Sequence, residues 1–427
     1  MTLIVFVGSL LAAMAVGIPI AFSLLVCGAA LMWHLGMLDP QILAQNLING
    51  ANSYPLLAVP FFLLAGELMN TGGLSRRIVN VAMVMVGHVK GGLGYVVIIA
   101  ACLLAAMSGS AVADAAALTT LLLPMMVAAG HDRARSAGLI ASAGIIAPIL
   151  PPSIGFVVFG VAANVSISKL FLAGIFPGLM LGASIWLVWW WLSRSESTLV
   201  PRPVRRPFKD VLVALGQAGW ALGLPVIIIV GLKMGVFTPT EAGVVAAVYA
   251  LFVSMVVYRE LRWNQLYGVF VRAARTTSVV MLLVAAAAVS AWLITIANIP
   301  QQIVTLLQPL HDDPRLLMAA IMVLVMIVGT ALDMAPTILI LTPVLMPVVA
   351  AAGIDPVYFG VLFMINNAIG LITPPVGVVL NTVAGVGKVG MDAVTKGVVP
   401  FMVAQFLLMF LMVLFPQLVT VPARWFH

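Results

Sequence analysis

The chain has 427 residues, of which 63% are hydrophobic and only 8% are charged, and its mean hydropathy is +1.20. Soluble globular domains carry about a quarter charged residues, so this composition excludes a water-soluble protein. The formal net charge of +7 comes largely from Lys and Arg in short loops. Such residues indicate orientation and contact with anionic membrane lipid, and they argue against a nucleic-acid partner.

Apolar runs without charge recur along the whole sequence. Each exceeds the ~20 residues with which a helix crosses the ~30 Å of membrane hydrocarbon. The first run has no Lys or Arg and is too long for a signal peptide, so it predicts a retained first crossing over residues 3–33. The runs are residues 1–38, 91–113, 136–168, 170–193, 211–232, 276–310, 334–354, 356–387 and 397–423.

An internal repeat becomes visible when the chain is slid along itself until Pro124 meets Pro347. Because backbone geometry, rather than hydrophobicity, constrains where Gly and Pro occur, their coincidence at one offset indicates a repeated fold. The same offset pairs Gly130 with Gly353, Asp132 with Asp355, Pro151-Pro152 with Pro374-Pro375, Gly174 with Gly397, and Pro177 with Pro400.

The loop charges predict that the two copies are inverted. The loop over residues 36–52 has no Lys or Arg, whereas its partner in the second copy contains Arg259, Arg262, Arg272 and Arg275. The next loop reverses the opposite way, because Arg76, Arg77 and Lys90 face Asp312, Asp313 and a lone Arg315. Basic loops stay in the cytoplasm, so corresponding loops lie on opposite sides of the membrane.

These patterns predict an all-α polytopic membrane protein with three parts. The first repeat covers residues 1–192, with scaffold helices, a re-entrant hairpin over 91–130 and a broken helix over 136–165. A basic cytoplasmic connector and one inverting helix cover residues 193–232. The second repeat covers residues 233–427, with scaffold helices, a hairpin over 315–353 and a broken helix over 356–387. Inverted repeats of this kind are frequent in secondary transporters.

Each hairpin has a Gly and hydroxyl tip that we expect at membrane depth. The tips are Met107-Ser108-Gly109-Ser110-Ala111 and Val328-Gly329-Thr330-Ala331-Leu332-Asp333. A helix that begins there offers N–H groups to an anion, while hydroxyls and carbonyls suit Na⁺. Asp114 and Asp333 are acids within apolar sequence, which marks an ion or substrate path, although either could instead cap a helix. Of the two, we expect Asp333 to be the more sensitive to substitution.

Each broken helix contains a Pro-Pro pair that releases backbone carbonyls. The first break contains Pro151, Pro152 and Ser153, and the second contains Thr373, Pro374, Pro375 and Gly377. The alternative is a simple kink repaired by neighbouring side chains. Asn366, Asn367 and Asn381 flank the second break and could donate to a ligand or join helices.

Enzyme chemistry finds little support in this sequence. Ser108 and Ser110 have no His or Lys nearby to activate them, and no GxxxxGK[ST] motif is present. Cys27 and Cys102 lie in apolar runs without metal-binding spacing. We therefore expect a transport protein without a cofactor.

Four segments together resemble the large membrane subunit of tripartite ATP-independent periplasmic (TRAP) transporters. They are Ser-Gly-Ser-Ala-Val-Ala-Asp from Ser108, Ile-Leu-Pro-Pro-Ser-Ile from Ile149, Leu-Asp-Met-Ala-Pro-Thr from Leu332 and Leu-Ile-Thr-Pro-Pro-Val-Gly from Leu371. The similarity spans essentially the whole chain and is nearest to permeases for sugar-derived keto acids.

The resemblance implies an elevator-type transporter in a bacterial inner membrane, driven by Na⁺ and taking up a small organic acid. It also implies two partners, a small four-helix membrane subunit and a periplasmic substrate-binding protein. The family's sodium and substrate region falls on Ser108, Gly109, Ser110, Pro151, Pro152 and Ser153 in the first copy. In the second copy it falls on Gly329, Thr330, Asp333, Thr373, Pro374, Pro375 and Gly377. Val376 stands where the first break has Ser153, so two cation sites would differ chemically.

Two other functions use the same features. An ion or anion channel would use the hairpins as a filter, and a proton-coupled carrier would replace Na⁺ by H⁺. A carrier saturates and stops when its driving gradient collapses, whereas a channel conducts without a fixed Na⁺ stoichiometry.

We predict a cytoplasmic N-terminus and a periplasmic C-terminus from the reversal of the basic loops. Reporter fusions after Arg206 and at His427 should then report opposite sides, cytoplasmic for the first and periplasmic for the second. Fusions that report the same side would contradict the inverted repeat.

Overall fold

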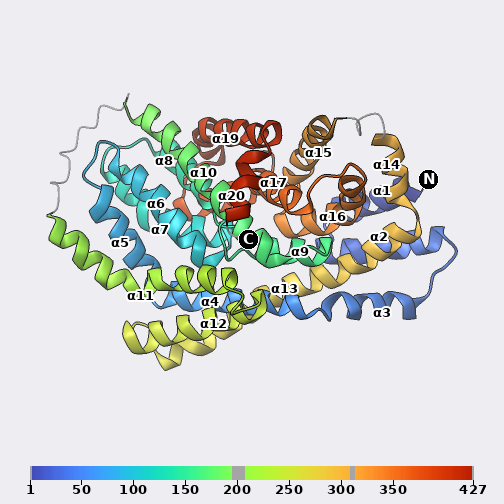
Figure 1. Cartoon of the computed structure of the whole chain (residues 1–427), viewed down its shortest axis with the longest axis horizontal. Helices are drawn as coiled ribbons and strands as arrows, with labels where there is room; N and C mark the ends of the chain where they lie inside the picture. The colour runs from blue at the N-terminus through green and yellow to red at the C-terminus, as the bar shows by residue number, and fades with distance from the viewer. Residues whose placement is uncertain (1, 195–206, 308–312, 426–427) are drawn as a thin grey trace.

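A computed structural model describes residues 2–194, 207–307 and 313–425. In these ranges the chain forms helices and no strand, as expected for an all-α membrane protein. Figure 1 shows the helices arranged as an elongated assembly, with the N-terminus at one end. Most of the predicted basic connector lies outside the described residues.

The first half of the chain forms ten α-helices and one short 3₁₀ turn. They are α1 (Thr2–Ala15), α2 (Ile20–His34), α3 (Pro40–Ala51), η1 (Tyr54–Leu57), α4 (Ala58–Thr71), α5 (Leu74–Val86), α6 (Gly92–Ser108), α7 (Ala111–Ala128), α8 (Arg133–Gly144), α9 (Ile154–Ala163) and α10 (Ile167–Arg194).

The second half follows with α11 (Phe208–Lys233), α12 (Pro239–Phe252), the π-helix η2 (Val253–Val257), α13 (Trp263–Ile296), α14 (Ile299–Leu307), α15 (Pro314–Gly329), α16 (Met334–Ala351), α17 (Pro356–Gly370), α18 (Val378–Gly387), α19 (Met391–Leu414) and α20 (Gln417–Trp425).

The predicted first crossing over residues 3–33 is wrong in one respect, because the segment is two helices. Helix α1 ends at Ala15, Gly17 takes a φ of +87°, and Pro19 precedes the first residue of α2. A proline lacks the N–H that a continuous helix needs at this point, and glycine adopts positive φ without strain. Helices α1 and α2 then pack against each other.

Eight helical stretches within the described residues are long and apolar enough to cross a membrane. This number supports a multi-pass membrane protein. The stretches are Tyr54–Thr71, Ala111–Ala128, Ile167–Arg194, Lys209–Lys233, Pro239–Val257, Trp263–Ile296, Met334–Ala351 and Met391–Leu414.

The helices divide into two groups by their contacts. Helices α1–α5 and α11–α14 are here called the band, in which α4 packs on α12 and α13 packs on α2 and α3. Helices α6–α10 and α15–α20, the body, pack through α8 on α19, α7 on α18 and α9 on α16. In Figure 1, α3, α4, α12 and α13 of the band run along the lower side, below α8, α10, α17 and α19 of the body. The two groups meet most extensively where α5 contacts α6 and where α13 and α14 contact α16, and they also meet where α4 contacts α6 and α9.

Helix bounds follow the offset of the sequence repeat. Helices α7 and α16 are separated by the same number of residues at both ends, and this is the offset from Pro124 to Pro347. Asp132 and Asp355 each cap the next helix, where they accept from the backbone N–H of Arg135 and Tyr358. The inversion of the two copies across a membrane stays a prediction.

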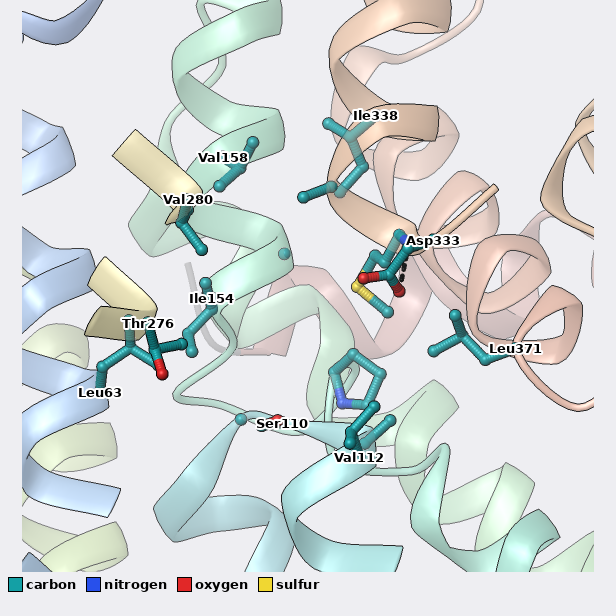
Figure 2. A pocket seen from close by; sticks show the side chains of 16 residues that line it. Leu63, Ser110, Val112, Ile154, Val158, Thr276, Val280, Asp333, Ile338 and Leu371 are labelled. Atoms are coloured by element: carbon teal, nitrogen blue, oxygen red, sulfur yellow. Dashed lines mark hydrogen bonds between the residues drawn. The ribbon is translucent and has the colours of Figure 1, made fainter. Parts of the chain in front are cut away.

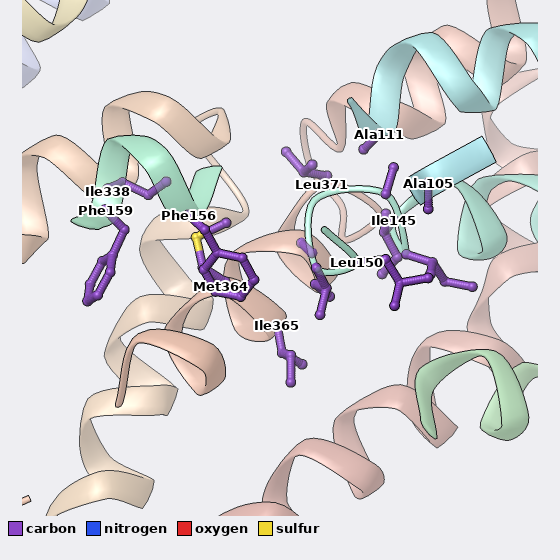
Figure 3. Close-up of a cluster of buried hydrophobic side chains, with 14 of the residues drawn as sticks. Ala105, Ala111, Ile145, Leu150, Phe156, Phe159, Ile338, Met364, Ile365 and Leu371 are labelled. Atoms are coloured by element: carbon purple, nitrogen blue, oxygen red, sulfur yellow. The ribbon is translucent and has the colours of Figure 1, made fainter. Parts of the chain in front are cut away.

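Close helix contacts at glycines join the two halves inside the body. A Cβ at Gly155 of α9 would collide with the Met364 side chain of α17, and one at Gly397 of α19 would collide with the Ala134 carbonyl of α8. Figure 3 shows the buried cluster beside the first contact, where Phe156 and Met364 lie next to each other. Small residues at such crossings let helix backbones approach closely, as is frequent in membrane proteins.

We predict that Gly397→Ala destabilises the protein by about 1–3 kcal/mol, because the added methyl must displace the α8 backbone. Gly385→Ala in α18 is the matched control, since nothing lies within 4 Å of its added Cβ. The measurement is the thermal unfolding midpoint of both variants in detergent. Equal midpoints for the two variants would contradict the glycine contact between α8 and α19.

Candidate substrate and cation site

The tip of the first hairpin is a two-residue turn between α6 and α7. Helix α6 ends at Ser108, Gly109 follows with a φ of +62°, and Ser110 caps α7 by accepting from the Ala113 N–H at 3.4 Å. The Ser110 N–H donates to the Ser108 hydroxyl oxygen at 3.2 Å. A Cβ at Gly109 would lie 2.5 Å from the Pro152 carbonyl oxygen, so the tip rests directly on the first broken helix.

Asp114 lies in the first turn of α7, inside the protein. Its side chain is 2% exposed, and the Ser108 hydroxyl donates to its Oδ1 at 2.5 Å. Its Oδ2 is buried and has no hydrogen-bond partner among the described residues. A buried carboxylate with one unsatisfied oxygen is costly unless a cation or a proton accompanies it.

The first break, at Pro151, Pro152 and Ser153, lies buried between α8 and α9. The peptide bond between the two prolines is cis. Ser153 caps α9 by accepting from the Phe156 N–H at 3.2 Å, and its hydroxyl donates to the Pro148 carbonyl at 2.5 Å. The serine hydroxyl therefore already has two local partners.

The tip of the second hairpin has a different composition. Helix α15 ends at Gly329, and the Thr330 hydroxyl donates to the Ile327 carbonyl at 2.8 Å. Asp333 caps α16 by accepting from the Met334 N–H at 2.8 Å and is exposed. Asp333 therefore corresponds to the cap Ser110, whereas Asp114 corresponds to the buried Thr337. The two acids are not counterparts, and the deeply buried one is Asp114.

The second break is more open than the first. Pro374 and Pro375 are exposed and joined by a cis bond, and Gly377, with a φ of +49°, directly precedes α18. The Thr373 hydroxyl donates to the Ile369 carbonyl at 2.8 Å. The Asn381 amide donates to the Val376 carbonyl at 2.7 Å, so it ties the break to α18 rather than reaching into a cavity.

Asn366 and Asn367 join α17 to the second hairpin. The Asn366 amide donates to the Met322 carbonyl at 2.5 Å and the Asn367 amide to the Met334 carbonyl at 3.2 Å. The Oδ1 atoms of both side chains are buried without a hydrogen-bond partner among the described residues. A Cβ at Gly370 would lie 2.8 Å from the Gly329 carbonyl oxygen, so this tip also rests on a broken helix.

Both tips reach one cavity of about 190 Å³ between the body and the band. In Figure 2, Ser110 of the first hairpin and Asp333 of the second lie on different sides of it. The lining residues are Leu63, Gly109, Ser110, Ala111, Val112, Pro148, Ile154, Gly155, Val158, Thr276, Val280, Asp333, Met334, Ala335, Ile338 and Leu371.

Three helices begin in the wall of this cavity. Ala111, Ile154 and Met334 are the first residues of α7, α9 and α16. Helix N-termini carry free N–H groups and a partial positive charge, which suits an anion. The lining contains no Lys or Arg, and its one acid is Asp333. An anion here would therefore rely on helix N-termini, and the nearby carboxylate would favour a cation beside it.

The band contributes wall residues that the sequence pattern did not suggest. Leu63 comes from α4, and Thr276 and Val280 come from α13. These residues belong to ordinary apolar helices, and only the packing of the band against the body brings them to the hairpin tips.

Comparison with known proteins identifies relatives over the whole length. Residues 7–418 match the family described as "Tripartite ATP-independent periplasmic transporter, DctM component". The 2,3-diketo-L-gulonate TRAP transporter large permease protein YiaN of Escherichia coli (strain K12) is 56% identical over 427 residues, which cover 100% of both chains. The sialic acid TRAP transporter large permease protein SiaM of Vibrio cholerae is 38% identical over 94% of this chain and 93% of its own.

The C4-dicarboxylate TRAP transporter large permease protein DctM of Pseudomonas aeruginosa is 35% identical over 87% of this chain and 86% of its own. The fold is similar to the crystal structure of the Alcanivorax borkumensis YdaH transporter, with a TM-score of 0.63 at 16% sequence identity, over 87% of this chain and 86% of that one. The chain therefore belongs to the DctM family and is a TRAP transporter large permease.

Proposed function

We propose that this permease takes up a sugar-derived keto acid, of the class of 2,3-diketo-L-gulonate, together with Na⁺. The observation that carries the proposal is the single cavity that both hairpin tips and three helix N-termini reach. The relative that is 56% identical bears the name of this acid, and other relatives bear the names of sialic acid and C4-dicarboxylates. All three are organic acids, which fits an anion held by helix N-termini.

The cation would bind beside the first tip. Ser108 and Asp114 supply oxygen atoms there, one Asp114 oxygen has no partner in the described structure, and the Pro152 carbonyl lies against Gly109. Hard cations such as Na⁺ prefer oxygen ligands of this kind. At the second tip the carbonyl of Gly329 and the hydroxyls of Thr330 and Thr373 are available, together with Asp333. Each of these two cation sites would contain one carboxylate, and the two sites would differ in the neutral oxygen atoms around it.

The transport step would be an elevator motion of the body against the band. The cavity lies at the boundary between them, and a second cavity of about 260 Å³ follows along it. Val158 of α9 lines both cavities, and Ala287, Ala288 and Ala291 of α13 line the second. The small side chains and free space along this part of the boundary would favour sliding.

The partners would be a small four-helix membrane subunit and a periplasmic substrate-binding protein, in a bacterial inner membrane with the basic loops in the cytoplasm. The family description calls the transporter tripartite, which leaves two further components. An isethionate permease named DctMQ matches 91% of this chain over only 61% of its own length, so it carries an additional segment.

The test is uptake of 2,3-diketo-L-gulonate into proteoliposomes that contain this chain with its small subunit and binding protein. An inward Na⁺ gradient should drive accumulation, and replacing Na⁺ by K⁺ should abolish it. A proton-coupled carrier, which the unpartnered Asp114 oxygen would also allow, would instead respond to a pH gradient in K⁺. Conduction without accumulation would indicate a channel.

We predict that Asp114→Asn folds but loses Na⁺-driven uptake by roughly tenfold or more, since a loss of about 1.4 kcal/mol of cation stabilisation changes affinity tenfold. The asparagine keeps the size of the side chain and removes the charge. Asp355→Asn is the control, because Asp355 caps α17 and does not line the cavity. Na⁺-driven uptake by Asp114→Asn at the wild-type rate would place the cation elsewhere.

A separate prediction distinguishes the two roles of Asp333, because Asn caps a helix about as well as Asp and Ala does not. Asp333→Asn should keep wild-type stability and still fail in Na⁺-driven uptake, whereas Asp333→Ala should lose about 1 kcal/mol of stability as well. Thermal unfolding and uptake of both variants are measured in parallel. Near-normal uptake by Asp333→Asn would leave Asp333 as a helix cap only.

A further inference from the structure

Two helices of the band carry polar residues one turn beyond the cavity wall. On α13, Thr276 lines the cavity and Arg272 precedes it by four residues; on α4, Leu63 lines it and Glu67 follows by four. Residues four apart on a helix share a face, with Cβ atoms about 5–6 Å apart. Arg272 and Glu67 therefore lie on the same helix faces as Thr276 and Leu63, one turn outside the cavity.

Arg272 and Glu67 contact each other across the two helices. The Arg272 Nε donates to Glu67 Oε2 at 2.9 Å, and an Arg272 terminal nitrogen donates to the Thr71 hydroxyl at 3.2 Å. The side chains are 54% and 33% exposed. A guanidinium has five N–H donors, so the contacts in the described structure leave several of them open to another acceptor.

The cavity wall comes within one helical turn of this pair. Thr276 lines the cavity and is exposed, and Arg272 lies four residues before it on α13. Thr71 is the last residue of α4, and the basic residues Arg76, Arg77, Arg259 and Arg262 stand in the sequence shortly after α4 and shortly before α13. An acid that leaves the cavity on this side passes Arg272, and the cavity lining itself contains no Lys or Arg.

We propose that Arg272 and Thr71 form a second carboxylate site, at the mouth of the cavity, where the carboxylate of the transported acid replaces Glu67 on the guanidinium. The proposal rests on the proposed transport of an organic acid. Carboxylate replaces carboxylate in this exchange, so the charge and the hydrogen-bond geometry are conserved. A partly exposed ion pair contributes little stability, which makes Glu67 easy to displace.

A second ion pair, between Arg77 and Glu260, has a different environment. Arg77 pairs with Glu260, donates to the Gly73 carbonyl at 3.2 Å and lies over the Tyr258 ring at 3.8 Å. Neither Arg77 nor Glu260 lines the cavity. The contacts of Arg77 hold it in place, so this pair is a matched control for the loss of a salt bridge.

The first experiment measures counterflow of 2,3-diketo-L-gulonate in proteoliposomes of the complete transporter, with the half-saturating acid concentration determined on each face. Arg272→Gln should raise this concentration severalfold on the face where Arg272 lies, with the other face unchanged. Glu67→Gln should lower it, because a competitor for the guanidinium is lost. Arg272→Lys, which keeps the charge, should lie between wild type and Arg272→Gln.

If the Arg272–Glu67 pair were only a structural salt bridge, Arg272→Gln and Glu67→Gln would shift the half-saturating acid concentration in the same direction. A shift in the same direction for both variants, or no shift in either, would therefore overturn the proposal. Arg77→Gln should leave the half-saturating concentrations unchanged. Arg275→Gln removes a neighbouring charge on α13, and an effect equal to that of Arg272→Gln would assign the result to general electrostatics and contradict the site. If Arg272→Gln does not insert into the membrane, the direction in which Glu67→Gln shifts the half-saturating acid concentration decides: a decrease supports the proposal, and an increase or no change overturns it.

The second experiment does not depend on transport. Phenylglyoxal labelling of Arg272 is followed by mass spectrometry in the purified transporter, with and without excess 2,3-diketo-L-gulonate. Protection of Arg272, stronger in Glu67→Gln and absent at Arg77, supports the site, and no protection overturns it. Protection in a wild-type protein without Na⁺-driven uptake would contradict the proposed function and leave the mouth site standing.

Discussion

Helices that end inside a membrane protein leave backbone N–H and carbonyl groups without helical partners, and the architecture of this permease depends on where those groups go. Each hairpin tip rests on a broken helix: Gly109 lies against the Pro152 carbonyl, and the Gly329 carbonyl lies against Gly370. Unpaired backbone groups are tolerated at such depth only where protein or a cavity satisfies them. The N-termini of α7, α9 and α16 lie at the cavity. The need to satisfy unpaired backbone groups therefore determines both the fold and the candidate site.

Charge determines how the site can work. The cavity offers helix N-termini to an anion but presents Asp333, and Asp114 lies buried beside it with one oxygen unpartnered in the described structure. The anion of the transported acid and the carboxylates of Asp114 and Asp333 cannot share this space without compensating positive charge. A bound cation would make anion binding favourable, and a bound anion would make cation binding favourable. This mutual dependence is the physical basis that we propose for coupling.

The sequence was informative wherever glycine and proline restrict the backbone. The turn at Gly109 and the two Pro-Pro breaks lie where the pattern placed them, and the family was evident from the same segments. The Gly17 and Pro19 pair carries an equally clear signal, although the apolar run around it predicts one crossing. An average of hydropathy over many residues hides such a break, whereas the glycine and the proline interrupt the helix at one point.

Other features could not be predicted from local sequence. The repeat offset already pairs Asp333 with Ser110, but the burial of Asp114 and the exposure of Asp333 depend on helix packing. The contributions of Leu63, Thr276 and the Arg272–Glu67 pair depend on the packing of α4 and α13 against the body. Contacts between distant helices leave no local periodicity, so a single sequence does not contain a signal for them.

The proposed coupling between the acid and Na⁺ is tested most directly by the flux of radioactive sodium into proteoliposomes of the complete transporter. If the two are coupled, Na⁺ enters only when the acid and its binding protein are present, in a fixed ratio to the acid transported. Sodium entry without the acid, or acid accumulation without sodium entry, would contradict this coupling.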